Sequence, residues 1–268
     1  MSGFAPDWLA LREPVDHASI NHAVRTACVR AFDGRGAIRI VDLGCGTGSN
    51  LRSLASALSV RQQWCLVDHD PRLLDVAKER CSAADLGAID EVTYRQEDLT
   101  RADMESLIAG ADLVTASALF DLVSAEFVER LATAVANQGA AFYTVLTYDG
   151  IAAFLPEHSA DAAARDAFHR HQRTDKGFGP ALGPGASAVL AAAFERRGYL
   201  VQRGNSPWVL DSSHAALRDE LVRGWAAAVR ETGLVSEPTV DDWLKHRLSP
   251  ATIAIIGHED LLALPRGR

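Results

Sequence analysis

The stretch VDLGCGTGSN, residues 41–50, places three glycines within five positions directly after a run of β-branched residues. The run AIRIV, residues 37–41, predicts a short buried strand, and residues 47–58 predict the helix that follows the loop. Glycine adopts backbone conformations that other residues avoid, so a loop of this kind lets the main chain approach a ligand closely. The stretch therefore predicts a nucleotide-like ligand at the carboxyl end of a strand.

Strands and helices alternate on both sides of this loop. The alternation predicts a parallel sheet with helices on both faces, which is an α/β doubly wound fold. Beyond residue 150 the pattern is less regular, and two late strands fit an antiparallel edge of the same sheet. The expected strands are residues 63–67, 92–95, 111–116, 139–147, 199–201 and 252–257, and the expected helices are residues 14–32, 71–83, 124–136, 186–197 and 213–232.

The length and composition are those of a globular enzyme. The chain has 268 residues, of which 48% are hydrophobic, and a formal net charge of −8. We expect one domain over residues 1–268, with an N-terminal helical segment at 1–36 and cap-like insertions at 151–185 and 211–250. The acidic balance disfavours a sequence-independent grip on nucleic acid, which needs a basic surface.

The cysteines and the apolar runs indicate a cytoplasmic protein. Cys28, Cys45, Cys65 and Cys81 show neither a C-x-x-C pair nor the spacing of zinc ligands, so we expect reduced thiols. The first residues lack the basic start and apolar core of a signal peptide. No apolar run reaches the ~18 residues that a membrane span requires, so no membrane partner is expected.

Two common glycine-loop ligands fit this sequence poorly. The dinucleotide fingerprint G-x-G-x-x-G would need a third glycine where Ser49 or Leu51 stands, and no Gly-Lys-Ser/Thr follows to make a phosphate-binding P-loop. Asp42 enters the loop instead. A carboxylate there suits a ligand with an ammonium group and clashes with a pyrophosphate. A nicotinamide-dependent dehydrogenase is therefore a weak alternative.

The loop, DLGCGTG at residues 42–48, resembles motif I of the class I S-adenosylmethionine-dependent methyltransferases. Three further positions fit that family: Asp68 after the second strand, Asp98 near the end of the third, and the loop SALFD, residues 117–121, after the fourth. The resemblance covers about residues 38–147. It implies a Rossmann-like seven-stranded sheet of order 3-2-1-4-5-7-6 and S-adenosylmethionine as the cofactor, with S-adenosylhomocysteine as its product.

The resemblance also implies the cofactor-binding residues. Asp68 would hold the ribose hydroxyls, Asp98 the adenine amino group, and Arg12 the methionine carboxylate. Three alternatives stay open: Asp68 and Asp98 as caps of the following turns, and Arg12 in a salt bridge to Asp16. The full predicted set is Asp42, Gly44, Cys45, Gly46, Gly48, Asp68, His69, Asp98, Leu99, Ser117 and Arg12.

The methyl acceptor is expected at the loops after the fourth and fifth strands. Tyr148 and Asp149, which we expect to close the fifth strand, and His171 are the candidate catalytic groups, with His171 or His169 as a base. The run HRHQRTDK, residues 169–176, either supplies cations to an acidic substrate or is a solvated charged turn. The predicted substrate-binding residues are His169, Arg170, Arg173, Lys176 and Trp208.

No metal site is expected. A Mg-dependent methyltransferase of the catechol type needs an Asp-Asn pair after the fifth strand, and Gly150 follows Asp149 here. The function expected is therefore metal-free methyl transfer from S-adenosylmethionine to a small polar or anionic metabolite in an enclosed pocket. The alternatives are a non-catalytic S-adenosylmethionine-binding protein and a methyltransferase for protein or RNA. O-, N-, S- and C-methylation are all compatible with this sequence, as are a monomer and a homodimer.

Overall fold

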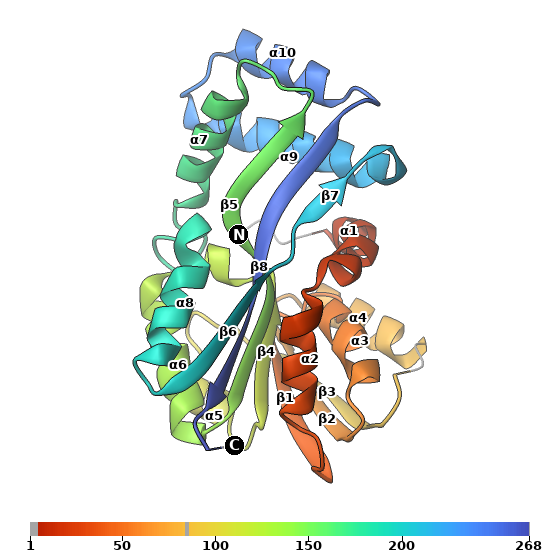
Figure 1. Ribbon diagram of the computed structural model, residues 1–268, viewed down its shortest axis with the longest axis vertical. Helices are drawn as coiled ribbons and strands as arrows, with labels where there is room; N and C mark the ends of the chain where they lie inside the picture. Colours follow the sequence, from red (N-terminus) through yellow and green to blue (C-terminus); the bar gives the residue numbers. More distant parts are fainter. Residues whose placement is uncertain (1–4, 84–85, 268) are drawn as a thin grey trace.

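A computed structural model describes residues 5–83 and 86–267 of the chain, and a mixed β-sheet forms its centre (Figure 1). The strand order is β3-β2-β1-β4-β5-β8-β6, and the short strand β7 pairs with β8 beside this path. The predicted α/β class and the predicted order are therefore confirmed, with β7 as an additional strand. The strands are β1 Ala37–Leu43, β2 Arg61–Asp68, β3 Ile89–Gln96, β4 Leu113–Ser117, β5 Ala141–Leu155, β6 Tyr199–Asn205, β7 Trp208–Leu210 and β8 Ile253–Pro265.

Helices cover both faces of the sheet (Figure 1). Helices α2, α3 and α4 pack on one face, where Val24, Leu51 and Leu74 belong to one buried cluster. Helices α5, α6 and α8 pack on the other face through a second buried cluster. The helices are α1 Pro6–Ser19, α2 His22–Arg30, α3 Ser49–Leu54, α4 Pro71–Ala83, α5 Met104–Leu107, α6 Ala125–Gln138, α7 Asp161–Gln172, α8 Ala186–Glu195, α9 Ala215–Thr232 and α10 Glu237–Arg247.

The parallel register brings the ends of three strands together. Asp42 of β1 is paired with Leu66 of β2 on one side and with Thr115 of β4 on the other. The loops that leave β1, β2 and β4 therefore emerge at the same edge of the sheet. In open α/β sheets this edge is where ligands bind.

Strands β5 and β8 are much longer than the sequence indicated. β5 has 15 residues and β8 has 13, and they pair antiparallel with register shifts at Thr144/Thr147 and Tyr148/Ala152. The expectation that the fifth strand ends at residue 147 is wrong. The dipeptide Asp149-Gly150 is typical of a turn. In the structure Gly150 has φ +93° and lies in the register shift between Tyr148 and Ala152, and β5 continues beyond it.

The extended halves of β5 and β8 carry a second layer, which we call the cap (Figure 1). The cap comprises these two half-strands with β7, α7, α9 and α10. Its buried cluster includes Phe154, Trp208, Trp225 and Trp243. Two of these contacts are edge-to-face: the Phe154 ring lies 5.6 Å from each of the Trp225 and Trp243 rings.

The N-terminal segment contains two helices in place of the single helix expected over residues 14–32. The chain breaks between α1 and α2 because Asn21 caps α2, its side-chain oxygen accepting from the N–H groups of Ala23 and Val24 at 3.1 Å each. The break lets α1 turn across the carboxyl edge of the sheet while α2 packs on its face. Within the described residues, no helix has the length and apolarity needed to cross a bilayer.

Candidate functional site

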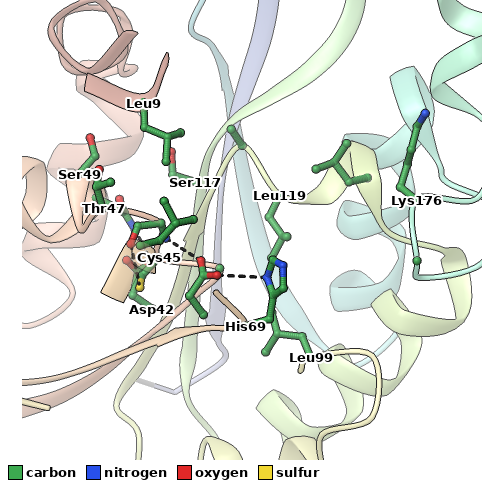
Figure 2. A pocket seen from close by; sticks show the side chains of 18 of the residues that line it. Leu9, Asp42, Cys45, Thr47, Ser49, His69, Leu99, Ser117, Leu119 and Lys176 are labelled. Carbon is green, nitrogen blue, oxygen red and sulfur yellow. Dashed lines mark hydrogen bonds and ion pairs between the residues drawn. The ribbon is translucent and has the colours of Figure 1, made fainter. Parts of the chain in front are cut away.

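A cavity of about 820 Å³ lies at the carboxyl edge of the sheet beneath α1 (Figure 2). This volume is in the range of small-molecule and cofactor sites. The structure brings all the predicted cofactor residues except Gly48 to its wall. These are Asp42, Gly44, Cys45, Gly46, Asp68, His69, Asp98, Leu99, Ser117 and Arg12.

Two positions of the glycine loop leave little room for a side chain. Gly46 has φ +53°, and a Cβ there would lie 3.3 Å from Leu9 Cδ1. Gly48 has φ +80°, and a Cβ there would lie 2.9 Å from the Cys81 sulfur. Gly46 thus leaves room at the cavity, whereas Gly48 lets the start of α3 pack closely against α4. Gly48 stands behind the wall and does not line the cavity.

Asp68 is held rigidly at the end of β2. Its Oδ2 accepts from the Gly46 N–H at 2.9 Å, and its Oδ1 accepts from the Asp70 N–H at 3.0 Å. His69 Nδ1 lies 3.2 Å from Oδ1. The capping role falls to Asp70, whose Oδ1 accepts from the Arg72 N–H at 2.9 Å. Asp68 is therefore a fixed acceptor in the cavity wall.

Asp42 offers an acceptor that no neighbour uses. Its Oδ1 accepts from Asn50 Nδ2 at 2.9 Å, and the same nitrogen donates to Thr115 Oγ1 at 3.0 Å. Oδ2 of Asp42 and Oγ1 of Thr47 are buried and have no hydrogen-bond partner among the described residues. Burial raises the pKa of Asp42 to about 7; the Asn50 hydrogen bond opposes this shift and the Asp68 charge adds to it. Two free acceptors of this kind suit an ammonium group.

Asp98 lines the cavity while it also caps a turn. Its Oδ1 accepts from the N–H and the hydroxyl of Thr100, at 3.0 and 2.7 Å. The Thr100 hydrogen bond is the main cause of a lowered pKa for Asp98. The turn alternative is thus present in the structure, and it leaves Asp98 at the wall beside Leu99.

Helix α1 covers the cavity, and polar residues in its second half bond to the surrounding structure. Arg12 bonds Asp16 at 2.7 and 3.2 Å, so the predicted salt bridge is present, and Arg12 also lines the cavity. Asp16 accepts from the Trp208 indole N–H at 3.0 Å, and the Arg12 guanidinium lies 4.9 Å from the Trp208 ring centre. Trp208 is buried in the cap core behind Asp16. The expectation that it lines the pocket is not met.

Ion pairs that the sequence did not indicate lock α1 onto the glycine loop. Glu13 accepts from Arg52 Nε and Nη2, both at 2.7 Å, and pairs with Arg80 at 2.9 Å. Arg52 Nη1 also donates to the Thr47 carbonyl at 2.7 Å, so one guanidinium joins the helix to the loop. The available signal was the spacing of Glu13, Asp16 and His17, which places three ionisable side chains on one face of a helix.

The loop after β4 forms the middle of the wall. Ser117, Ala118 and Leu119 line the cavity, and Ala118 has φ +50°. A positive φ at a residue other than glycine costs energy and tends to occur at functional sites. The neighbouring Asp121 has its pKa raised to about 6 by burial, with Arg12 acting in the opposite direction.

The two predicted catalytic residues of the fifth strand lie outside the cavity wall. Tyr148 OH is 2.9 Å from His169 Nε2, and Asp149 Oδ1 accepts from the Ile151 N–H at 2.8 Å. Burial raises the pKa of Tyr148 and lowers that of His169. The expected placement is wrong because β5 continues past both residues into the cap, so they lie inside a strand and not in a loop.

Helix α7 divides the charged run at residues 169–176 between two hollows. Arg170 and Arg173 line a separate hollow of about 440 Å³ between α7 and residues 234–235. His171, next to the last residue of α7, and Lys176, in the loop after it, line the main cavity. Arg170 and Arg173 share one face of the helix because they are three positions apart, and His171 lies on another face. The run is therefore neither one substrate site nor one solvated turn.

Comparison with known proteins agrees with this geometry. Residues 40–139 match a family model described as a methyltransferase domain. No curated protein matches the sequence. The YcgJ protein from Bacillus subtilis is 11% identical over 92% of this chain and 100% of its own, with a TM-score of 0.52. The cyclopropane synthase MmaA2 from Mycobacterium tuberculosis is 11% identical over 97% of this chain and 94% of its own, with a TM-score of 0.51.

A methyltransferase from Geobacter sulfurreducens, solved with S-adenosylhomocysteine, is 18% identical over 98% of this chain and 99% of its own, with a TM-score of 0.48. The two structures with higher TM-scores agree with the fold, and the family model assigns residues 40–139 to the methyltransferases. The family match covers 100 of the 268 residues, and the two solved structures add a likeness of fold.

Proposed function

We propose that this protein transfers the methyl group of S-adenosylmethionine to a small polar or anionic metabolite held in the cavity beneath α1. The observation that carries the proposal is the continuity of this cavity. One wall consists of the glycine loop, Asp68 and Asp98, and the opposite wall consists of His171 and Lys176 from the segment that follows β5. This continuity supports the binding of a donor and an acceptor in the same cavity.

The residues present fit the cofactor. Its sulfonium carries the methyl group as a strong electrophile, so the protein mainly needs to align an acceptor and exclude water. Asp42 Oδ2 and Thr47 Oγ1 would receive the ammonium group, and Asp68 would receive the ribose hydroxyls. Helix α1, locked by Glu13, closes the site from above and limits the approach of water.

The acceptor end of the cavity is lined by apolar side chains. Leu119, Leu122 and Phe178 line it, with α1 above and the segment 171–178 opposite. A folded protein or an RNA helix would need an open groove here. The net charge of −8 also disfavours a polyanionic substrate. These features support a small molecule as the acceptor.

The test uses S-adenosylmethionine labelled in its methyl group, incubated with the protein and a lysate that is then divided into small-molecule, protein and nucleic-acid fractions. We expect label in the small-molecule fraction, and loss of that label with Asp68→Asn. Asp75→Asn, an exposed acid on α4, is the matched control and should behave like the wild type. Label confined to a macromolecular fraction would overturn the metabolite proposal. Cofactor binding with no label anywhere would indicate a non-catalytic binder.

The pKa of Asp42 gives a pH prediction. The ammonium of S-adenosylhomocysteine should bind the ionised carboxylate, and burial leaves Asp42 partly protonated near pH 7. Affinity should therefore rise between about pH 6 and about pH 7.5, below the pKa of an ordinary α-amino group. Isothermal titration calorimetry would measure it.

The control for this prediction is a second acid in the same wall. Asp42→Asn should bind more weakly and lose the pH dependence. Asp98→Asn should keep the dependence, because the pKa of Asp98 is lowered and this group is already ionised. An unchanged slope in Asp42→Asn would show that another group titrates.

A further inference from the structure

The cavity wall contains one cation, Lys176, that forms no ion pair with a carboxylate among the described residues. Lys176 Nζ lies 3.5 Å from both ring nitrogens of His171, at the long limit of a hydrogen bond. No ion pair joins Lys176 to a carboxylate in the described part of the chain. Lys176 is half-buried and lines the cavity.

The nearby carboxylates are committed to other groups. Asp175 Oδ1 accepts from the N–H groups of Gly177 and Gly179, at 2.7 and 3.0 Å, and so stabilises its own turn. Glu231 pairs with His171 Nε2 at 3.0 Å. The other strong cation of the wall, Arg12, is neutralised by Asp16 at 2.7 Å. Lys176 therefore differs from Arg12 in having its charge available.

The surface between Lys176 and the cofactor wall is apolar. Leu119 lies between the labelled residues of the glycine loop and Lys176, which stands at the far side of the view (Figure 2). Leu122 and Phe178 line the same part of the cavity. An acceptor that spans this distance would place apolar atoms against these side chains and an anionic group at the ammonium.

We propose that Lys176 is an anion-binding subsite, which selects acceptors that carry a carboxylate or phosphate group on an apolar body. The proposal rests on the proposed function and specifies its substrate class. His171 holds the lysine side chain toward the cavity from one side, with Glu231 fixing the imidazole in turn. The apolar residues then orient the body of the acceptor so that its nucleophile faces the cofactor.

The chain makes a direct test possible, because it contains only three lysines, Lys78, Lys176 and Lys245. Reductive methylation with ¹³C-formaldehyde keeps their charge and gives each lysine its own NMR signal, assigned with Lys→Arg variants. The protein is loaded with S-adenosylhomocysteine and titrated with benzoate, phenyl phosphate and neutral benzyl alcohol. We expect benzoate or phenyl phosphate to shift the Lys176 signal and to leave Lys78 and Lys245 unchanged.

A variant pair measures the size of the effect in unmodified protein. Lys176→Met should weaken binding of the preferred anion about tenfold or more, as expected for a lost charge-assisted hydrogen bond. Lys245→Met, an exposed position on α10, is the matched control and should bind the anion like the wild type. Benzyl alcohol should bind the wild type and Lys176→Met equally.

The outcomes separate the two proposals. If S-adenosylhomocysteine binds but neither anion shifts Lys176, or if benzyl alcohol binds as well as benzoate, the anion subsite is wrong and the proposed function stands. If S-adenosylhomocysteine itself does not bind, the proposed function fails first. A shift by phenyl phosphate alone would identify a phosphorylated acceptor, and a shift by benzoate alone a carboxylic acid.

Discussion

Replacing Asp68 by Asn should weaken the binding of S-adenosylhomocysteine about 100-fold, because two charge-assisted hydrogen bonds to the ribose would be lost or weakened. Asp68 is buried and fixed by the N–H groups of Gly46 and Asp70, so it cannot move to compensate. The asparagine oxygen can keep one of these internal bonds. Calorimetric titration of the variant, with circular dichroism as a check on folding, measures the loss.

The control for Asp68 is its neighbour in sequence and type. Asp70→Asn removes a carboxylate that caps α4 and bonds Arg72, and Asp70 does not line the cavity. It should bind S-adenosylhomocysteine almost as tightly as the wild type. If Asp70→Asn weakened binding as much as Asp68→Asn, the effect would belong to the loop's conformation and not to a ribose contact.

Replacing Glu13 by Gln should both destabilise the protein and weaken cofactor binding. Glu13 lies almost fully buried between Arg52 and Arg80, and breaking a buried pair from one side typically costs about 3 kcal/mol in the free energy of unfolding. Arg52 also holds the Thr47 carbonyl, so the glycine loop should loosen with α1. Urea unfolding measures the first effect and titration with S-adenosylhomocysteine the second.

Glu13 also predicts how acid affects the protein. Burial acts to raise the pKa of Glu13, but the hydrogen bond and charge of Arg52 outweigh it and hold the pKa below its ordinary value of 4.5. The stability that Glu13 contributes is therefore present above about pH 4.5 and is lost as the pH falls through the lowered value. Glu13→Gln should lose this part of the acid dependence.

A surface ion pair supplies the control for Glu13. Asp90 pairs with Arg61 at 3.0 Å, far from the cavity, and Arg61 is exposed. Asp90→Asn should change neither the unfolding midpoint nor cofactor affinity measurably. A Glu13→Gln protein that unfolds and binds like Asp90→Asn would contradict the proposed role of Glu13 in fixing α1.

The grouping of the glycine loop, Asp68 and Asp98 around one cavity could be predicted from the sequence because its signals are local. The glycine loop leaves β1, Asp68 is the last residue of β2 and Asp98 comes shortly after β3, and the parallel register then brings them to one edge. That packing also brings Cys81 close to Gly48 and lets Asn50 donate a hydrogen bond to Asp42. Asn50 comes shortly after the glycines in the sequence, and this position was the signal that could have placed it in the site.

The acceptor half depends on contacts between distant segments. Tyr148 is paired with His258, and Ala152 with Ile256, across more than a hundred residues of chain. No local pattern indicates that β5 continues through Asp149-Gly150, since that dipeptide is typical of a turn. The same pairing moves Tyr148 and Asp149 out of the site and builds the cap around Trp208.

The sequence by itself predicted the α/β fold, because hydrophobic periodicity acts over a few neighbouring residues. The strand order came from the resemblance of the glycine loop to methyltransferase motif I. The tertiary structure alone decided which charges meet the ligand. It buried Arg12 against Asp16 and turned Arg170 and Arg173 to another hollow, while it left Lys176 facing the cavity. A side chain's charge is available to a substrate only where folding brings it to the cavity without a counterion, and that depends on residues far apart in the chain.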